Sequence, residues 1–342
     1  MNKLLKFCIV ICLIVTNLFV FGQNEWNNVE VFKVNKLEPR TNVIPYSSNI
    51  DTFNFNYQKS DYYLSLNGNW KFYWVDNFDK APKDFYSLDY IDDNWENIKV
   101  PSNWELNGYG VPIYVNQKNE FPSDPPNAPL INNPVGCYRT TFQVPFLWID
   151  KEVILHFGAV KSAFYLWVNG EYVGYSEDSK TPAEFNITKY LKRGKNLIAL
   201  KVFRFSDGSY LECQDFWRIS GIERDVFLYA KPKVSIDDYT IKSSLINNYK
   251  DGLLNVELKL KNWTDKAIKK PFKVKFEFFD KEKNLVKSLA RYAEFSGVNY
   301  DQETNTSKLL IDEYVIPNIN SWNAEKPYLY TLIITLSDFK GE

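Results

Sequence analysis

The chain of 342 residues is long enough for two or three domains, and its hydrophobic share of 45% is enough to bury a sizeable core. Aromatic residues make up 17% of the chain, which favours β structure and also suits carbohydrate contact, because an aromatic face stacks on a sugar ring. The formal net charge of −1 provides no large positive field, so nucleic acid is excluded as an expected partner.

Residues 1–22 have the pattern of a secretory signal peptide. Lys3 and Lys6 form a short basic segment, Phe7–Phe21 is almost wholly apolar, and Gly22 is a small residue at a suitable cleavage position. The apolar run is short for a membrane span, which favours cleavage over a permanent anchoring helix. The pattern predicts a secreted or periplasmic protein that has no membrane association once the signal is removed.

Two cysteines remain after such a cleavage. Cys8 and Cys12 lie inside the predicted signal, which leaves Cys137 and Cys213 in the mature chain. An exported protein permits a disulfide, but one pair does not make a disulfide framework. Pairing and two free thiols therefore both remain open.

Residues 23–63 are irregular and polar, and the rest of the chain divides into two strand-rich regions. The first stretch contains Pro39 and Pro45 and shows no sustained period, which predicts an extended arm. Residues 64–232 contain short alternating segments separated by turn residues. The strongest hairpin signal is Asn169-Gly170, between two runs of alternating residues. This pattern predicts a jelly-roll β-sandwich.

The single histidine and the last region complete the predicted fold. His156 lies in a strand-like stretch with no nucleophile motif beside it, which favours a structural role over a catalytic triad. Residues 233–342 alternate again, with about seven strands expected in roughly 100 residues, the size of an immunoglobulin-like sandwich. Because no strand–helix alternation occurs, the sequence predicts an all-β chain without a TIM barrel.

One loop concentrates polar and aromatic residues. The segment Ser206–Arg218 combines the carboxylates of Asp207, Glu212 and Asp215 with aromatic rings and one arginine. Loops on a rigid sandwich commonly carry binding residues. A turn with a structural ion pair is an equally good interpretation of the same residues. Sequence alone does not show which distant carboxylates lie close together in the fold.

The order and spacing of several motifs closely resemble those of the large β-galactosidases of glycoside hydrolase family 2. The resemblance extends over about 200 residues and is looser from Val234 onward. It is carried by these runs, among others: Ser65–Phe72 (SLNGNWKF), Val100–Trp104 (VPSNW), Pro112–Asn116 (PIYVN), Asn133–Tyr138 (NPVGCY), Trp167–Gly170 (WVNG), Ser206–Glu212 (SDGSYLE), Ser220–Ile222 (SGI) and Arg224–Val226 (RDV).

The resemblance implies a jelly-roll sugar-binding domain, an immunoglobulin-like domain and then a TIM barrel that carries both catalytic glutamates. It therefore implies that this chain is the N-terminal part of an exported, retaining β-galactosidase that hydrolyses terminal non-reducing β-D-galactose residues. No catalytic residue is expected in this chain, which alone should be inactive without the missing barrel. The implied partners are a galactoside or oligosaccharide substrate, the barrel domain and other copies in a homo-oligomer.

The resemblance also assigns two sugar-contacting residues, Asn116 and Asp215. Asp215 would in addition bind a sodium ion, whose other side-chain ligand would come from the barrel. A carboxylate accepts hydrogen bonds from sugar hydroxyls, and oxygen ligands suit a hard cation. Cys213, two residues before Asp215, stands where an aspartate is usual.

A structural magnesium is the second metal that the resemblance implies. Its expected ligands are Glu25 and Asn28 from the arm and Glu177 and Asp207 from the jelly roll, together with the Val31 carbonyl. Glu25 and Glu177 differ in type from the usual residues, but both keep an oxygen ligand. Ordinary packing of the arm on the sandwich is the alternative interpretation.

Two other functions remain in view at this point. One is a non-catalytic secreted carbohydrate-binding protein, and the other is a structural or adhesion β-sandwich protein. Tight galactose binding by the isolated chain would favour the former, and indifference to sugars would favour the latter. The sequence does not name the natural glycan.

Overall fold

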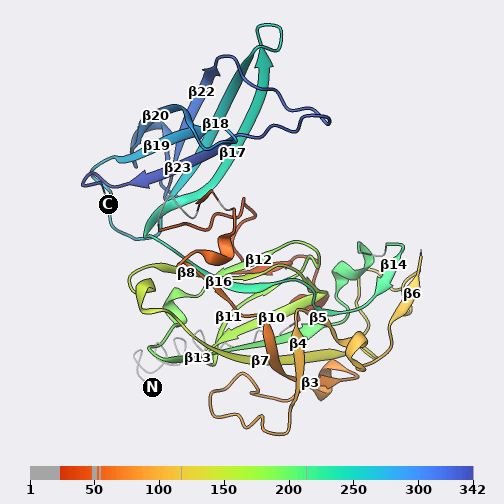
Figure 1. Ribbon diagram of the computed structural model, residues 1–342. Helices are drawn as coiled ribbons and strands as arrows, with labels where there is room; N and C mark the ends of the chain where they lie inside the picture. The colour runs from red at the N-terminus through yellow and green to blue at the C-terminus, as the bar shows by residue number, and fades with distance from the viewer. Residues whose placement is uncertain (1–23, 48–51, 54, 117, 213, 342) are drawn as a thin grey trace, which may run out of the picture.

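The computed structural model describes residues 24–47, 52–53, 55–116, 118–212 and 214–341. The predicted signal peptide and Cys213 lie outside these residues. The regular elements of the described part are β-strands and short 3₁₀ helices, so the predicted all-β class is confirmed and these residues form no TIM barrel. Among them, no helix is both long enough and apolar enough to cross a membrane. Figure 1 shows two β domains stacked one above the other.

The lower domain in Figure 1 is a sandwich of two large sheets. One sheet has seven strands in the order β1-β11-β10-β13-β7-β3-β4, and the other has four in the order β12-β8-β16-β2. Their bounds are β1 Lys33–Val34, β2 Tyr63–Ser65, β3 Gly68–Val75, β4 Glu96–Val100, β7 Val135–Gln143, β8 Glu152–Phe157, β10 Ala163–Val168, β11 Glu171–Ser176, β12 Ala183–Asn186, β13 Lys195–Phe203 and β16 Val226–Lys231.

A core rich in aromatic rings fills this sandwich. Trp70, Phe72, Trp104, Tyr138 and Phe157 are all fully buried within a single hydrophobic cluster. Such large rings dominate the burial of apolar surface, which is the main favourable term in folding. Much of the high aromatic content is therefore core packing, while other rings, such as those of Tyr114 and Trp217, remain exposed toward one edge of the sandwich.

Two small sheets extend the sandwich at that edge. β5 (Ser102–Asn103), β15 (Gly221–Ile222) and β9 (Val160–Lys161) form a three-stranded sheet. β6 (Ile113–Val115) and β14 (Phe216–Arg218) form a two-stranded ribbon, which projects at the side of the domain in Figure 1.

The upper domain is a second sandwich, built around its own core. One sheet has the order β17-β18-β22-β21 and the other β20-β19-β23. Leu258, Leu260 and Val274 are fully buried between them. The strands are β17 Val234–Ile246, β18 Asp251–Asn262, β19 Phe272–Phe279, β20 Leu285–Ala293, β21 Tyr300–Asp301, β22 Thr306–Ile316 and β23 Thr331–Ser337.

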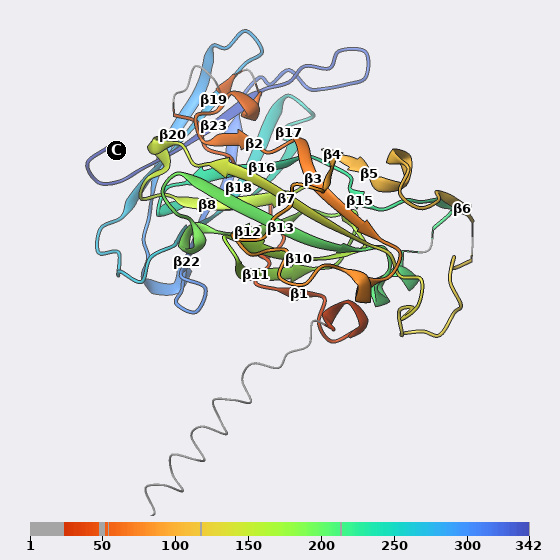
Figure 2. The same cartoon turned by 90° about the horizontal axis from the view of Figure 1, so that it is seen from below.

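The predicted arm is extended and is packed on the lower domain. Its first turn, η1 (Glu25–Asn27), buries Trp26, whose ring lies 5.0 Å from that of Phe203 and 4.9 Å from that of Phe78. β1 then pairs with β11, so the arm adds a strand to the edge of the larger sheet (Figure 2).

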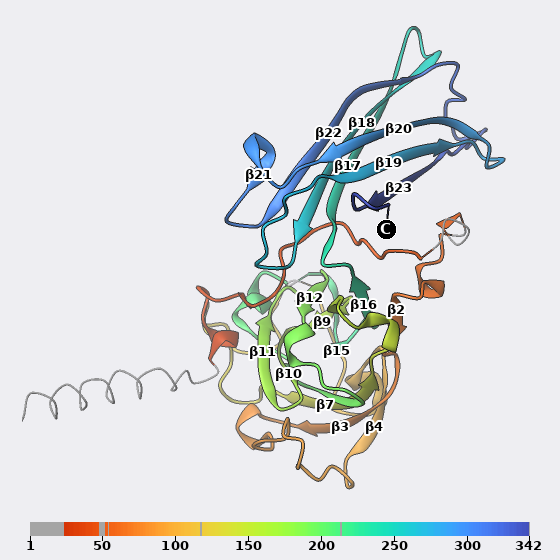
Figure 3. The ribbon, with the colours of Figure 1, turned by 90° about the vertical axis from the view of Figure 1, so that its left-hand side faces the viewer.

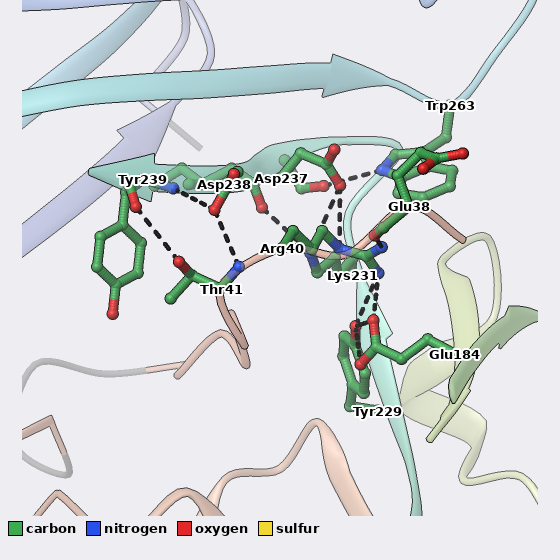
Figure 4. Close-up of polar contacts among 12 residues, drawn as sticks. Glu38, Arg40, Thr41, Glu184, Tyr229, Lys231, Asp237, Asp238, Tyr239 and Trp263 are labelled. Atoms are coloured by element: carbon green, nitrogen blue, oxygen red, sulfur yellow. Dashed lines mark hydrogen bonds and ion pairs between the residues drawn. The ribbon is translucent and has the colours of Figure 1, made fainter. Parts of the chain in front are cut away.

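After β1 the arm crosses between the two domains, as Figure 3 shows. There Arg40 is buried, and its guanidinium lies 2.6 Å from Glu184 of the lower domain and 3.4 Å from Asp237 of the upper one. The next residue, Thr41, donates its backbone N–H to the carboxylate of Asp238 at 3.0 Å (Figure 4). One short stretch of arm therefore binds carboxylates of both domains.

The single histidine belongs to this buried polar junction. His156 Nδ1 lies 2.9 Å from Glu184 Oε1, and the imidazole stacks on Phe227 with ring centroids 4.2 Å apart. Glu184 also accepts from the Tyr229 hydroxyl at 3.0 Å. These contacts are those of a packed core group, which agrees with the structural role that its strand position indicates.

Lys231 gives this junction an expected pH dependence. Burial, reinforced by the charge of Arg40, lowers the pKa of Lys231 to about 8, and Asp237 only partly offsets this. An unfolded lysine has a pKa near 10.4, so between pH 8 and about 10.4 the unfolded chain binds more protons than the folded one. Stability contributed by this group must therefore rise with pH across that window.

We expect the unfolding free energy of the wild type, relative to Lys231→Met, to increase between pH 7 and pH 9.5. Below pH 8 both states hold the proton and the folded state carries the cost of burying it. Urea unfolding of both proteins at the two pH values measures the difference. A difference that is the same at pH 7 and pH 9.5 would contradict the assignment.

Candidate functional site

The two-stranded ribbon brings together the two residues that the resemblance assigned to sugar contact. β6 and β14 pair antiparallel, with Val115 opposite Phe216 at one end. Asn116 follows Val115 and Asp215 precedes Phe216, so the two side chains occupy neighbouring positions at the same end of the ribbon. Both residues are exposed, which leaves their polar groups free to meet a ligand.

Tyr114 adds a third polar group to this end of the ribbon. Its hydroxyl donates a hydrogen bond to Asp215 Oδ1, across a separation of 101 residues in sequence. This bond and the Asp215 charge raise the pKa of the Tyr114 hydroxyl, so it remains a donor at neutral pH. The sequence analysis did not single out Tyr114. The signal was present, because residues two apart on a strand share a face and Tyr114 stands two before Asn116.

Exposed aromatic rings surround these polar groups. Tyr114 is 55% exposed, Phe216 51% and Trp217 48%. The rings of Tyr114 and Trp217 meet edge to face, with centroids 5.7 Å apart. A carboxylate, a carboxamide and exposed rings on one ribbon are the groups that bind sugars, because hydroxyls need acceptors and donors while ring C–H faces need apolar surface.

Beneath the ribbon lies a buried ionic network around Arg204. Its Nη2 lies 2.8 Å from Glu120 Oε2, and its Nη1 lies 3.4 Å from Glu105 Oε1. Burial raises the pKa of both carboxyls, although the nearby guanidinium opposes that shift. Arg218 of β14 is also buried and donates from Nη2 to the Val115 carbonyl at 3.3 Å.

The four residues predicted to bind magnesium lie in one neighbourhood. η1 of the arm lies beside η7 (Asp207–Tyr210), and Asn28, just after η1, donates its backbone N–H to the Glu25 carbonyl at 3.1 Å. Glu177 and Asp207 are both buried, and the Tyr175 hydroxyl donates to Glu177 Oε1. Burial, together with the charge of Asp207, raises the pKa of Glu177 to about 8. The charge of Asp207 therefore disfavours ionisation of Glu177.

The fit of a cation to this neighbourhood is partial. Asp207 Oδ2 is buried and accepts no hydrogen bond from the described residues, so one ligand oxygen is free. Glu25 is turned toward Tyr165, whose hydroxyl donates to Glu25 Oε2 at 2.7 Å. Consistent with this, the described residues contain no group of three or more His, Cys, Asp or Glu arranged to hold a metal. Two buried carboxyls that disfavour each other's ionisation would be stabilised by a bound cation.

Of the two cysteines that could pair or remain free thiols, Cys137 lies within the described residues. Cys137 is a buried free thiol, and burial raises the pKa of that thiol to about 12. A thiol held protonated in this way is a poor nucleophile. Cys213 lies outside the described residues, so the structure gives no account of it.

Comparison with known proteins gives consistent matches along the chain. Residues 63–232 match the family described as "Glycosyl hydrolases family 2, sugar binding domain", and residues 234–342 match "Glycosyl hydrolases family 2". A β-galactosidase of Priestia megaterium is 41% identical over 327 residues, which cover 94% of this chain and 31% of that protein. One of Alteromonas mediterranea is 37% identical, with 94% and 30% covered.

A solved structure supports the fold. A calcium-binding mutant of Bacteroides uniformis β-glucuronidase 2 aligns with a TM-score of 0.63 at 20% identity, over 81% of this chain and 31% of that one. At that identity the likeness concerns the fold alone. The chain spans about a third of the length of the curated relatives that it matches.

Proposed function

Because the chain belongs to glycoside hydrolase family 2, we propose that it is the N-terminal, sugar-contacting part of an exported β-galactosidase. The complete enzyme would hydrolyse terminal non-reducing β-D-galactose residues with retention, using two glutamates on a barrel domain that follows this chain. The observation that carries the proposal is the exposed ribbon that holds Asn116 and Asp215 side by side.

The ribbon's chemistry supports a helper role rather than a catalytic one. A retaining glycosidase needs two carboxyl groups about 5–5.5 Å apart across the scissile bond. At the ribbon the carboxylate of Asp215 is held by a tyrosine hydroxyl, and its neighbour Asn116 is an uncharged amide. Asp215 therefore suits binding a sugar hydroxyl, while bond cleavage is left to the barrel.

Sugar preference tests the proposed activity. We expect the complete enzyme to hydrolyse a nitrophenyl β-galactoside in preference to the corresponding glucuronide, since the curated relatives are β-galactosidases. The 342-residue chain alone should give no turnover of either. A preference for the glucuronide, or turnover by the chain alone, would overturn this part of the proposal.

Asp215 would also bind the sodium ion of the complete enzyme. Its Oδ1 accepts from Tyr114, and the carboxylate is exposed, so its second oxygen is open to a cation. A single carboxylate oxygen is too few ligands for a hard cation. The remaining ligands would come from the sugar, from water and from the barrel.

A magnesium ion would bind between the arm and the jelly roll, with Glu177 and Asp207 as its carboxylate ligands and Glu25 and Asn28 beside them. We expect Mg²⁺ to raise the melting temperature of the 342-residue chain. A ligand that binds only the folded state adds about 2.7 kcal/mol at a hundred times its Kd. Because Mg²⁺ would compete with protonation of Glu177, whose pKa is raised, the shift should be larger at pH 8 than at pH 6.

Asp207→Asn should abolish this thermal shift, because it removes the negative charge and replaces one buried carboxylate oxygen with an amide nitrogen, a poor ligand for Mg²⁺. Asp79→Asn is the matched control, since Asp79 is exposed on the same domain and should leave the shift intact. Differential scanning fluorimetry with and without a chelator measures both. A wild type that melts at the same temperature with Mg²⁺ and with the chelator would refute the site.

Export is the last part of the proposal and rests on the pattern of residues 1–22. The mature protein should be recovered from the periplasm or the medium, with an N-terminus close to residue 23. Cell fractionation followed by N-terminal sequencing measures both. An unprocessed N-terminus in the cytoplasmic fraction would reject export.

A further inference from the structure

Strand pairing and apolar burial hold the ribbon only weakly against the rest of the domain. β6 and β14 hydrogen-bond to each other and to no other strand of the described part. Their large side chains are about half exposed at Tyr114, Phe216 and Trp217, so burial of apolar surface contributes little to fixing their position. Whatever positions Asn116 and Asp215 must therefore lie mainly in polar contacts beneath the ribbon.

Arg204 supplies those contacts to both strands at once. It directly follows β13, and its backbone N–H donates to the Pro134 carbonyl, just before β7, at 2.9 Å, so its backbone is anchored at the end of the seven-stranded sheet. Its Nη2 reaches the carbonyl of Val111, two residues before β6, at 3.3 Å. The same nitrogen reaches the carbonyl of Arg218, the last residue of β14, at 3.4 Å.

Two carboxylates hold the guanidinium in this place. Glu120 lies beyond the far end of β6, and its Oε2 is 2.8 Å from Nη2 of Arg204. Glu105 precedes β6, and its Oε2 accepts the backbone N–H of Ser220, just after β14, at 2.7 Å. The network therefore ties the chain before β6, after β6 and after β14 to one buried cation.

We propose that Arg204, held by Glu105 and Glu120, is a positioning residue that fixes the ribbon so that Asn116 and Asp215 present their side chains to the sugar. The inference rests on the proposed function for its sugar, but the anchoring itself stands on the contacts alone. A planar guanidinium offers several donors in fixed directions, whereas a lysine offers one compact charge. Arg204→Lys therefore keeps the charge but loses the simultaneous contacts.

Hydrogen exchange on the 342-residue chain tests the anchoring without any substrate. In Arg204→Lys we expect the backbone amides of residues 113–115 and 216–218 to exchange at least about tenfold faster, because local opening costs less free energy. Amides of β7 and β10 should be unchanged. Glu120→Gln removes one ion-pair partner of Arg204 but keeps the shape of the side chain, and it should produce the same local pattern. This second variant carries the test if Arg204→Lys does not fold.

The matched control is Arg139→Lys. Arg139 is equally buried in the same sandwich and pairs with Asp92 at 2.7 Å, but it makes no contact with the ribbon. Its substitution should leave exchange at the ribbon unchanged. Unchanged ribbon exchange in both Arg204→Lys and Glu120→Gln, or an equal effect of Arg139→Lys there, would overturn the anchoring role.

A mutant cycle in the complete enzyme tests whether the anchor acts through the sugar-contacting side chains. Arg204→Lys should lower kcat/KM for a β-galactoside by about tenfold or more, since misplacement by an ångström costs as much as a hundredfold. In a background that already carries Asn116→Ala and Asp215→Ala, the same change should cost less than about twofold. If Arg204→Lys lowers kcat/KM by the same factor in both backgrounds, Arg204 does not act through Asn116 and Asp215.

The two failures are distinguishable. If Asp215→Ala alone leaves kcat/KM unchanged, the proposed function fails, whatever Arg204 does. If Asp215→Ala lowers kcat/KM but Arg204→Lys neither loosens the ribbon nor lowers kcat/KM, only the positioning inference fails.

Discussion

In the complete enzyme, Asp215→Ala is expected to lower kcat/KM for a β-galactoside by about tenfold to a hundredfold. The carboxylate lies exposed at the end of the ribbon, where it would accept hydrogen bonds from sugar hydroxyls. A hydrogen bond to a charged group contributes roughly 1.5–3 kcal/mol, and each 1.4 kcal/mol is about a factor of ten. Loss of the proposed sodium ligand would add to the effect.

The fold should survive this substitution, because an exposed side chain contributes little to stability. The melting temperature of the variant should therefore stay close to that of the wild type. Asp93→Ala is the matched control, since Asp93 is exposed on the same domain, away from the ribbon, and should leave kcat/KM unaltered. Steady-state kinetics of the three proteins decide the matter, and wild-type kinetics in Asp215→Ala would reject the assignment of Asp215 to the sugar.

Asn116→Ala should also lower kcat/KM for a β-galactoside, but by a smaller factor, because a neutral amide forms weaker hydrogen bonds than a carboxylate. The order of the two effects is informative. A larger loss from Asn116 than from Asp215 would indicate that the amide, rather than the carboxylate, makes the principal sugar contact.

The strands and turns of this chain were largely accessible to sequence reasoning, because their signals are local. Alternation within residues 233–342 predicted strands there, and β18 spans Asp251–Asn262 with burial that alternates at every residue. Asn169 and Gly170 have φ of 54° and 87°, the two positive values that the tight turn between β10 and β11 requires. In both cases the backbone geometry follows from residues close together in sequence.

Composition singled out the loop that carries Asp215, but its pairing with the strand before Asn116 was accessible only through the resemblance. The two strands of the ribbon are three residues each and about 100 residues apart, so no periodicity reveals that they pair. Arg204 was missed for a related reason. It stands in an alternating stretch next to Phe203 and Phe205, and nothing in that pattern shows that its charge is buried under a distant ribbon.

The arm illustrates the same limit. Its irregular, proline-containing sequence predicts extended chain, which is compatible with either a loose tail or a buried segment between domains. The arm is held between the domains because Arg40 pairs with Glu184 and Asp237, which lie about 140 to 200 residues further along the sequence. Tertiary contacts of that range leave no local trace.

We expect Arg40→Met to lower the free energy of unfolding by about 3–5 kcal/mol, the usual cost of removing one partner from a buried charge network. The guanidinium lies 2.6 Å from Glu184, 3.1 Å from the Tyr229 hydroxyl and 3.4 Å from Asp237. Methionine fills similar volume, so the loss would reflect charge rather than a cavity. Glu184 keeps His156 as a partner, which favours the lower end of this range.

Lys80→Met is the control that separates the effect of burial from the loss of an ion pair. Lys80 pairs with Asp76 at 2.6 Å, as close as Arg40 to Glu184, but both side chains are more than half exposed. Exposed pairs contribute about 0–1 kcal/mol, so the urea midpoint should barely move. Because Arg40 joins the two domains, its loss should also separate their unfolding, which lowers the apparent slope against urea. If the urea midpoint of Arg40→Met stays as close to the wild-type midpoint as that of Lys80→Met, the arm lies between the domains without binding them together.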